Sequence, residues 1–272
     1  MSQATASDPT RLIRHLEELT LNTAPAIHQH FYDGWVLRAS GTETHRSNSV
    51  TALHESTLPL DEKVAYSESW YRVHQQPIIF RVNDALSPLG LDDLLQARGY
   101  SKAAETVVMT ADSRLFSALA DLPLGVKLVE RDLAESLADL HHMKGTAPQV
   151  MAQEIKRQAL WRGPQTVLNL RSINGVVCSG MARLDGGHVG VFDIYTPENQ
   201  RGKGYASILV QYLLAWGARH GARTAFLQVL VTNEPAIAVY KRLGLAPSYR
   251  YWSRLKRACV DEERAKINHD EC

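Results

Sequence analysis

A turn between an expected strand and an expected helix constrains this 272-residue chain more than any other feature. Residues 188–196 are expected to form a strand, and Pro197 stops it because proline has no amide hydrogen to donate to a sheet. A strongly amphipathic helix follows within ten residues. Its buried face is expected to comprise Ile208, Leu209, Tyr212, Leu213 and Trp216. The chain is therefore expected to pass from a strand through a tight turn directly into a helix.

The turn itself contains two glycines, Gly202 and Gly204, and two cations, Arg201 and Lys203. Glycine lets the backbone approach a ligand closely, and the free amides of a helix's first turn attract anions. The pattern is not a Walker loop, because Lys203 is followed by glycine instead of Ser or Thr. A dinucleotide fingerprint also fits poorly, since Ser207 stands where its third glycine is needed. The turn therefore predicts a site for a diphosphate.

A second punctuated helix follows an expected strand over residues 224–231. Asn233 is a favoured N-cap, Pro235 suits the first helical turn, and Gly244 suits a left-handed stop. Ala236 and Tyr240 are four residues apart and share one face of that helix. The segment therefore predicts a tyrosine hydroxyl beside a small residue that leaves room for a ligand.

These two segments resemble the GNAT N-acetyltransferase superfamily. Residues 201–206 read RGKGYA and match its Q/R-x-x-G-x-G/A signature, and residues 233–244 match its N-x-x-A-x-x-x-Y-x-x-x-G segment in order and spacing. The resemblance implies acetyl-CoA as co-substrate, with its pyrophosphate on the glycine turn. The implied coenzyme-binding residues are Ile194, Tyr195, Thr196, Arg201, Gly202, Lys203, Gly204, Tyr205, Ala206, Asn233, Ala236 and Tyr240.

The resemblance also implies direct acetyl transfer to a primary amine of a small molecule or peptide. Tyr240 would protonate the departing thiolate. Asp193 is the first choice for general base, with Glu198 and a water relay as alternatives. Strict alternation along the strand predicts Asp193 and Tyr195 on one face, with Phe192 and Ile194 on the other.

Other classes of function remain as alternatives or are disfavoured. A non-catalytic acyl-CoA binding or sensing module would carry the same turn, and a dinucleotide oxidoreductase would instead bind NADH. We expect no nucleic-acid partner, because 30 Lys and Arg balance 29 Asp and Glu. No metal is expected: His141 and His142 are adjacent on a helix, point about 100° apart, and are interpreted as part of a solvated face.

The fold class expected is α/β (α+β), a mixed and mostly antiparallel central sheet flanked by helices. Residues 1–115 are interpreted as an accessory α/β domain, a degenerate GNAT-like half in which residues 80–100, a strand followed by the segment 91–100, echo residues 236–245. Residues 126–257 are expected to form the catalytic domain, after a linker at 111–125, and residues 258–272 a flexible tail. Expected helices lie at 11–21, 63–75, 91–99, 133–143 and 150–160, and expected strands at 35–38, 49–53, 78–82, 104–110, 126–130, 166–172 and 176–184.

The sequence also gives expectations about the compartment. The cysteines Cys178, Cys259 and Cys272 are odd in number and form no CxxC pair, which favours a reducing cytoplasm. The first nine residues lack the features of a secretory signal, and residues 206–216 are too short for a membrane span. A cytoplasmic monomer or homodimer without a membrane partner is therefore expected.

Overall fold

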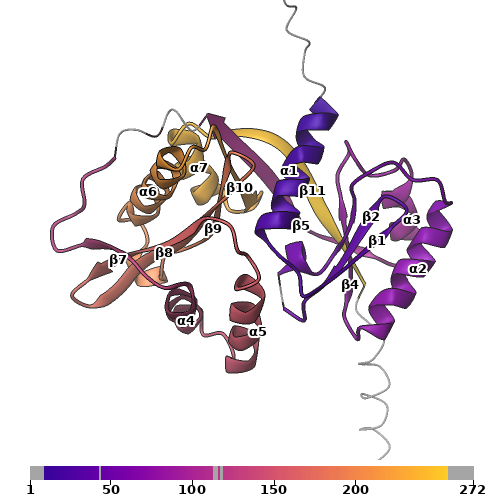
Figure 1. The fold of residues 1–272 in the computed structure, drawn as a ribbon, viewed down its shortest axis with the longest axis horizontal. Coiled ribbons are helices and arrows are strands. Elements are labelled where there is room, and N and C mark those ends of the chain that lie inside the picture. Colours follow the sequence, from indigo (N-terminus) through magenta and orange to yellow (C-terminus); the bar gives the residue numbers. More distant parts are fainter. Residues whose placement is uncertain (1–8, 43, 113–115, 117–118, 257–272) are drawn as a thin grey trace, which may run out of the picture. The chain divides into compact units, whose positions relative to one another are not determined.

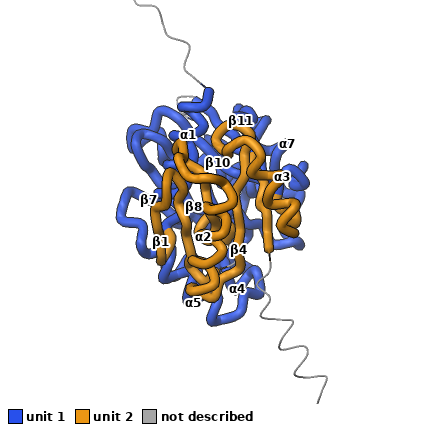
Figure 2. The backbone as a smooth tube through the Cα atoms, turned by 90° about the vertical axis from the view of Figure 1, so that its right-hand side faces the viewer, with its two compact units in different colours: residues 1–25, 105–250 blue, residues 26–104, 251–272 orange. Residues whose placement is uncertain are grey.

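The chain divides into two compact units in a computed structural model (Figures 1 and 2). The structure describes residues 9–42, 44–112, 116 and 119–256. Unit 1 comprises residues 1–25 and 105–250, and unit 2 comprises residues 26–104 and 251–272. The expected tail at 258–272 lies outside the described residues.

Unit 1 contains a sheet in the order β5-β10-β9-β8-β7-β6. Its neighbours pair antiparallel except β9 and β10, which are parallel. A tight hairpin at Asn174-Gly175 joins β7 to β8. The strands are β5 (Ser101–Asp112), β6 (Lys127–Glu130), β7 (Gln165–Ser172), β8 (Gly175–Asp185), β9 (His188–Tyr195) and β10 (Thr224–Leu230).

Helices cover both faces of this sheet (Figure 1). On one face α6 and α7 pack over a large apolar core that includes Leu209, Leu213 and Val191. On the other face α1 and α4 contact the sheet, and α5 packs against α4. The helices are α1 (Pro9–Thr23), α4 (Leu133–Lys144), α5 (Pro148–Gln158), α6 (Tyr205–Arg219) and α7 (Glu234–Arg242), with a 3-10 turn η3 (Glu198–Gln200).

A glycine brings α6 close to the sheet. A Cβ on Gly217 would lie 2.5 Å from the Cβ of Val189 on β9, a distance that real side chains do not adopt. The helix therefore rests directly on the strand that leads into it.

Unit 2 contains the strands in the order β1-β2-β3-β4-β11. Strands β3 and β4 are parallel, and the other pairs are antiparallel. Its core includes Trp35, Val64, Phe80 and Leu95. The elements are β1 (His28–Tyr32), β2 (Trp35–Ala39), a 3-10 turn η1 (His45–Ser47), β3 (Val50–Ala52), α2 (Leu60–Val73), β4 (Ile78–Val82), α3 (Leu91–Ala97) and β11 (Ala246–Lys256).

The chain passes between the units inside two strands, β5 and β11. Residues 106–112 of β5 pair with β10 in unit 1, whereas residues 252–256 of β11 pair with β4 in unit 2. The boundary between the units therefore does not lie at the expected linker, residues 111–125, because β5 and α1 pack with the C-terminal half. Strands β1 and β11 were not expected from the sequence.

The fold class expected from the sequence is confirmed: mixed sheets, mostly antiparallel, are flanked by helices. Within the part of the chain that the structure describes, no helix combines the length and the apolarity needed to cross a membrane.

Candidate functional site

The parallel strands β9 and β10 separate partway along their length. They pair from His188 with Thr224 to Val191 with Leu227. Beyond that point β9 runs on to Tyr195 and β10 to Leu230, and no further pair joins them in the described sheet. The sheet of unit 1 therefore opens at the end of β9, next to the turn that begins α6.

A bulge in β9 accompanies this opening. Between the pairs Met181–Phe192 and Ser179–Tyr195, β9 contains one more residue than β8. Asp193 has φ +54°, a left-handed conformation that is uncommon outside glycine. Such an outlier often marks a functional position.

The bulge corrects the strict alternation expected along β9. Ile194 packs with Val191 in the core under α6, while Phe192 packs in the core on the opposite face. The expectation that Phe192 and Ile194 share a face was therefore wrong, because the extra residue shifts the alternation. Asp193 and Tyr195 both contact elements on the α4 and α5 face.

The glycine turn is open at both glycines. Gly202 and Gly204 have φ +79°, and a Cβ added to either would meet no atom within 4 Å. Gly204 is the N-cap of α6, so the amides of the first helical turn have no partner within the helix. Arg201 donates from Nε to the Thr196 carbonyl at 3.2 Å, and Lys203 donates to Gln200 Oε1 at 2.9 Å.

Tyr205 and Ala206 begin α6 directly after the glycine turn. Their side chains pack against the core under α6. Their amides belong to the first turn of the helix, where amides lack intrahelical partners.

Tyr240 and Cys178 lie close together on the α6 and α7 face. Tyr240 is 8% exposed, and burial together with the nearby Cys178 raises the pKa of its hydroxyl to about 12. Burial also raises the pKa of the Cys178 thiol to about 11, and Thr196 Oγ1 donates to its sulfur at 3.2 Å. At neutral pH both the phenol and the thiol therefore keep their protons.

The start of α7 has the cap expected from the sequence. Asn233 Oδ1 accepts from the Ala236 amide at 3.3 Å, and Pro235 stands in the first turn. The helix ends before Gly244, which has φ +87°. Ala236 packs with Tyr240 at the edge of the core, so the two residues share a face as predicted.

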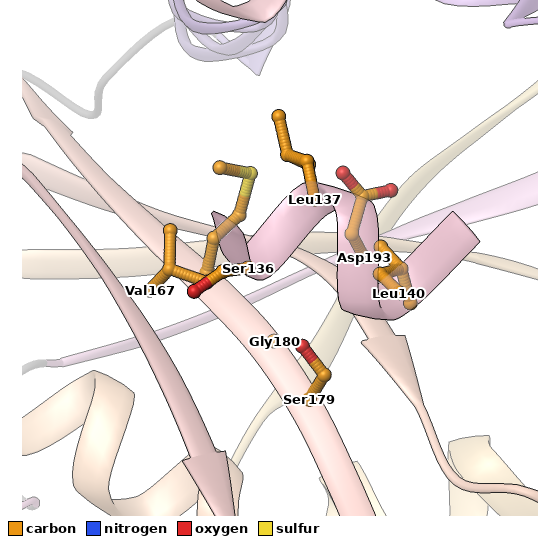
Figure 3. A pocket seen from close by; sticks show the side chains of 8 residues that line it. Ser136, Leu137, Leu140, Val167, Ser179, Gly180 and Asp193 are labelled. Atoms are coloured by element: carbon orange, nitrogen blue, oxygen red, sulfur yellow. The ribbon is translucent and has the colours of Figure 1, made fainter. Parts of the chain in front are cut away.

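The other face of β9 forms a shallow, closely packed pocket under α4 that leaves no room for a water molecule. Figure 3 shows side chains of α4 beside those of the strands, with the Asp193 carboxylate among them. Glu198, the alternative base, is 85% exposed at its side chain and pairs with Arg201 at 3.4 Å. The pocket is lined by Ser136, Leu137, Leu140, Val167, Ser179, Gly180, Met181 and Asp193.

A buried polar network connects this pocket to α5. Gln158 Nε2 donates to Asp193 Oδ2 at 3.2 Å and to Glu154 Oε1 at 3.1 Å. Arg157 forms a bidentate ion pair with Glu154, with Nε to Oε2 at 2.9 Å. The carboxylate of Asp193 has no Lys, Arg or His nitrogen within 4.0 Å among the described residues. No cation within the described part of the chain therefore contacts this carboxylate.

His141 was interpreted from the sequence as part of a solvated face, and this was wrong. It is 8% exposed, with Nδ1 3.1 Å from Thr146 Oγ1. Burial, followed by the charge of Lys144, lowers its pKa. The signal that was missed is its spacing, because His141 is one turn after Leu137 and shares its inward face. His142 is exposed, as expected.

Comparisons with known proteins agree with this architecture. A family model described as "Probable histone acetyltransferase Rv0428c C-terminal" matches residues 10–253. The "Uncharacterized N-acetyltransferase YobR" of Bacillus subtilis (strain 168) is 28% identical over 249 residues, which cover 90% of this chain and 99% of that protein.

Solved structures share the fold at low sequence identity. A GCN5-related N-acetyltransferase from Kribbella flavida superimposes with a TM-score of 0.69 at 15% identity, covering 95% of this chain and 99% of that one. A tandem GNAT protein from the clavulanic acid biosynthesis pathway gives a TM-score of 0.58 at 16% identity, covering 72% and 69%.

The fold and these relatives define an N-acetyltransferase of the GNAT type. Within that class, the chain belongs to the family described as "Probable histone acetyltransferase Rv0428c C-terminal", whose model spans both units.

Proposed function

We propose that the protein transfers an acetyl group directly from acetyl-CoA to a primary amine. The observation that carries this proposal is the separation of β9 and β10 beside an open glycine turn at the start of α6. Proteins of the GNAT type use acetyl-CoA. A strand opening next to an anion-binding helix end suits a long thiol arm that is joined to a diphosphate.

The residues of the turn fit the diphosphate of the coenzyme. The open space above Gly202 and Gly204 would accommodate phosphate oxygens against the amides of the first turn. Arg201 and Lys203 lie on either side of Gly202 and contribute positive charge. The backbone of residues 194–196 would line the thiol arm, and the amide nitrogen of Asn233 is available to it because the cap uses only Oδ1.

Tyr240 suits the role of general acid. The coenzyme supplies the acetyl thioester, and the departing thiolate needs a proton. Because its pKa is raised to about 12, the Tyr240 hydroxyl is protonated at neutral pH and has a proton to give. Cys178 holds its own proton with a pKa of about 11, so the thiol is a poor nucleophile, and direct transfer is favoured over a covalent acyl-enzyme.

Asp193 suits the acceptor side of the reaction better than Glu198. Asp193 lies on the left-handed bulge at the end of β9, where β9 and β10 separate, and no cation of the described residues contacts its carboxylate, which fits an ammonium group. Glu198 is exposed and paired with Arg201. We therefore assign Asp193 to binding the acceptor's ammonium group and to accepting its proton, directly or through water.

Calorimetric titration with acetyl-CoA tests this proposal. The wild type is compared with a Gly202→Asp, Gly204→Asp double variant, which places bulk and negative charge at the turn. Gly221→Asp is the matched control, because Gly221 has φ +88° and the same open surroundings after the other end of α6. We expect binding by the wild type and the control and none by the double variant. Failure of the folded wild type to bind acetyl-CoA would overturn the proposal.

A further inference from the structure

Gln158, the last residue of α5, is the one described residue that donates a hydrogen bond to the Asp193 carboxylate. Its Nε2 donates to Asp193 Oδ2 at 3.2 Å. Asp193 is partly exposed, and its Oδ1 accepts no hydrogen bond from the described residues and keeps contact with solvent. The two oxygens of this carboxylate therefore differ, because the protein holds Oδ2 and leaves Oδ1 accessible.

The amide of Gln158 is fixed in one orientation. Its Nε2 also donates to Glu154 Oε1 at 3.1 Å, so both amide hydrogens point at carboxylates. A flipped amide would place Oε1 against two acidic groups that only accept hydrogen bonds. In the orientation observed, Oε1 is buried without a partner, which proteins usually avoid. The fold therefore accepts an unpaired oxygen and keeps the bond to Asp193.

Buried groups hold both the side chain and the main chain of Gln158. Arg157 forms the bidentate ion pair with Glu154, and its Nη1 donates to the Pro25 carbonyl at 2.9 Å. Arg183 Nη2 donates to the main-chain carbonyl of Gln158 at 3.0 Å. Glu154, Arg157 and Gln158 are at most 7% exposed. The end of α5 is therefore a rigid support for the carboxylate on β9.

A carboxylate that takes a proton needs such support. Asp193 has φ +54° and lies on the bulge of β9, where the regular pairing with β8 is interrupted. Rotation of its side chain would move Oδ1 away from a bound acceptor, and small displacements of a reacting group are costly to the rate. Since Gln158 supplies the hydrogen bond to Oδ2, it restrains this rotation.

We propose that Gln158 is a positioning residue, which holds Asp193 by Oδ2 so that Oδ1 takes the proton from the ammonium group of the acceptor. This inference rests on the proposed acetyl transfer. The proton passes from the ammonium nitrogen to Oδ1, directly or through water, and leaves later to solvent. The neutral amine then forms the C–N bond as the C–S bond of the thioester breaks. The thiolate takes the proton of Tyr240, which regains one from the attacking nitrogen.

Crystal structures of the wild type and of Gln158→Met test the geometry without any acceptor. Methionine has nearly the same length as glutamine and lacks the amide. The variant also loses the unpaired Oε1, so we expect a Tm close to that of the wild type. We expect Asp193 Oδ1 to move by about 1 Å or more, a displacement that matters for catalysis. A carboxylate that keeps its wild-type position in the variant overturns the proposal.

A double-mutant cycle tests whether Gln158 acts through Asp193. Release of the coenzyme thiol is followed with spermidine, tyramine and a lysine-containing peptide as acceptors. We expect Gln158→Met to lower kcat/KM by roughly tenfold to hundredfold and to leave the Kd of acetyl-CoA unchanged. In an Asp193→Asn background the same substitution should change kcat/KM by less than about twofold, because the two residues act as one unit. An equal loss in both backgrounds would overturn the proposal.

Gln211→Met is the matched control. Gln211 Oε1 on α6 accepts from the Ala120 amide at 3.2 Å, and its substitution should leave kcat/KM within about twofold of the wild-type value. An Asp193-dependent enzyme that is indifferent to Gln158→Met would contradict the positioning role alone. Acetylation of none of the three amines, or full activity of Asp193→Asn, would instead contradict the proposed function.

Discussion

The helices α6 of unit 1 and α2 of unit 2 stand in the same structural context but begin differently. Each connects two parallel strands, β9 to β10 in unit 1 and β3 to β4 in unit 2. Before α6 the chain turns at Gly202 and Gly204, and open space lies above both. Before α2 the amides of Thr57 and Leu58 donate to the carboxylate of Asp33.

In unit 2 the carboxylate of Asp33 therefore accepts hydrogen bonds from the backbone amides that precede α2. The Leu58 and Thr57 hydrogen bonds, with help from Lys63, hold the pKa of Asp33 well below its usual range. Lys63 is buried over the Trp35 ring and completes this arrangement. One connection is therefore closed by the chain's own carboxylate, whereas open space lies above the two glycines of the other, which fits the proposed diphosphate.

The next helices, α3 and α7, end in the same way. The Tyr100 amide donates to the Leu95 carbonyl, and the Leu245 amide donates to the Tyr240 carbonyl, each at 3.0 Å. Gly99 precedes Tyr100 and Gly244 precedes Leu245, and both glycines have positive φ. Leu95 therefore occupies the position in unit 2 that Tyr240 occupies in unit 1. We infer that the units share one scaffold and that only unit 1 carries the groups that the proposed chemistry needs.

The largest effect is expected when Tyr240 is replaced by leucine, the residue type at the corresponding position, Leu95, of unit 2. Tyr240→Leu should lower kcat by roughly 10²–10⁴-fold, the usual contribution of a general acid, and leave the Kd of acetyl-CoA nearly unchanged. Release of the coenzyme thiol, measured with any accepted amine, reports kcat. The conservative Tyr240→Phe should behave alike. A kcat within a few-fold of the wild-type value would contradict the role of Tyr240 as general acid. A non-catalytic sensing module would likewise lose little on this substitution.

A loss of stability, and not of coenzyme binding, is expected from Asp33→Asn. Because the pKa of Asp33 is depressed in the folded state, its ionised form stabilises the fold above the unfolded pKa of about 3.9, and this advantage falls as pH drops toward the folded value. Thermal unfolding should therefore show a lower Tm for the variant at neutral pH. The two Tm values should converge in strongly acidic solution. A difference that is independent of pH would contradict this account.

The smallest effect is expected from the exposed cations of the turn. Arg201→Gln and Lys203→Gln should each weaken acetyl-CoA binding by a few-fold, since exposed charges contribute roughly 1 kcal/mol or less. The effect should shrink in high salt, which screens exposed charges. Titrations at two ionic strengths measure it. Arg72→Gln, in the last turn of α2, is the control and should change nothing.

Local features of the site could be predicted from the sequence, because they depend on neighbouring residues. The turn before α6, the Asn233 cap and the stop at Gly244 follow from side chains that act within a few positions. The echo between residues 80–100 and 236–245 falls on α3 and α7, whose ends have matching hydrogen bonds.

Features that depend on distant contacts could not be predicted. The bulge at Asp193 puts a residue other than glycine at positive φ, and nothing in the local sequence indicates it. Strand β11 pairs with β4, about 170 positions earlier, and its first residues are exposed and lack an apolar alternation. The amide of Asn169 is buried without a hydrogen-bond partner. This depends on how β7, β8 and α4 pack together, which the local sequence does not indicate.

Amide hydrogen exchange with and without acetyl-CoA compares both helix connections in one experiment. We expect acetyl-CoA to slow exchange at residues 194–206 and 233–240 of unit 1 and to leave residues 53–60 of unit 2 unchanged. Slower exchange at 53–60, or no change at 194–206 under saturating acetyl-CoA, would contradict it.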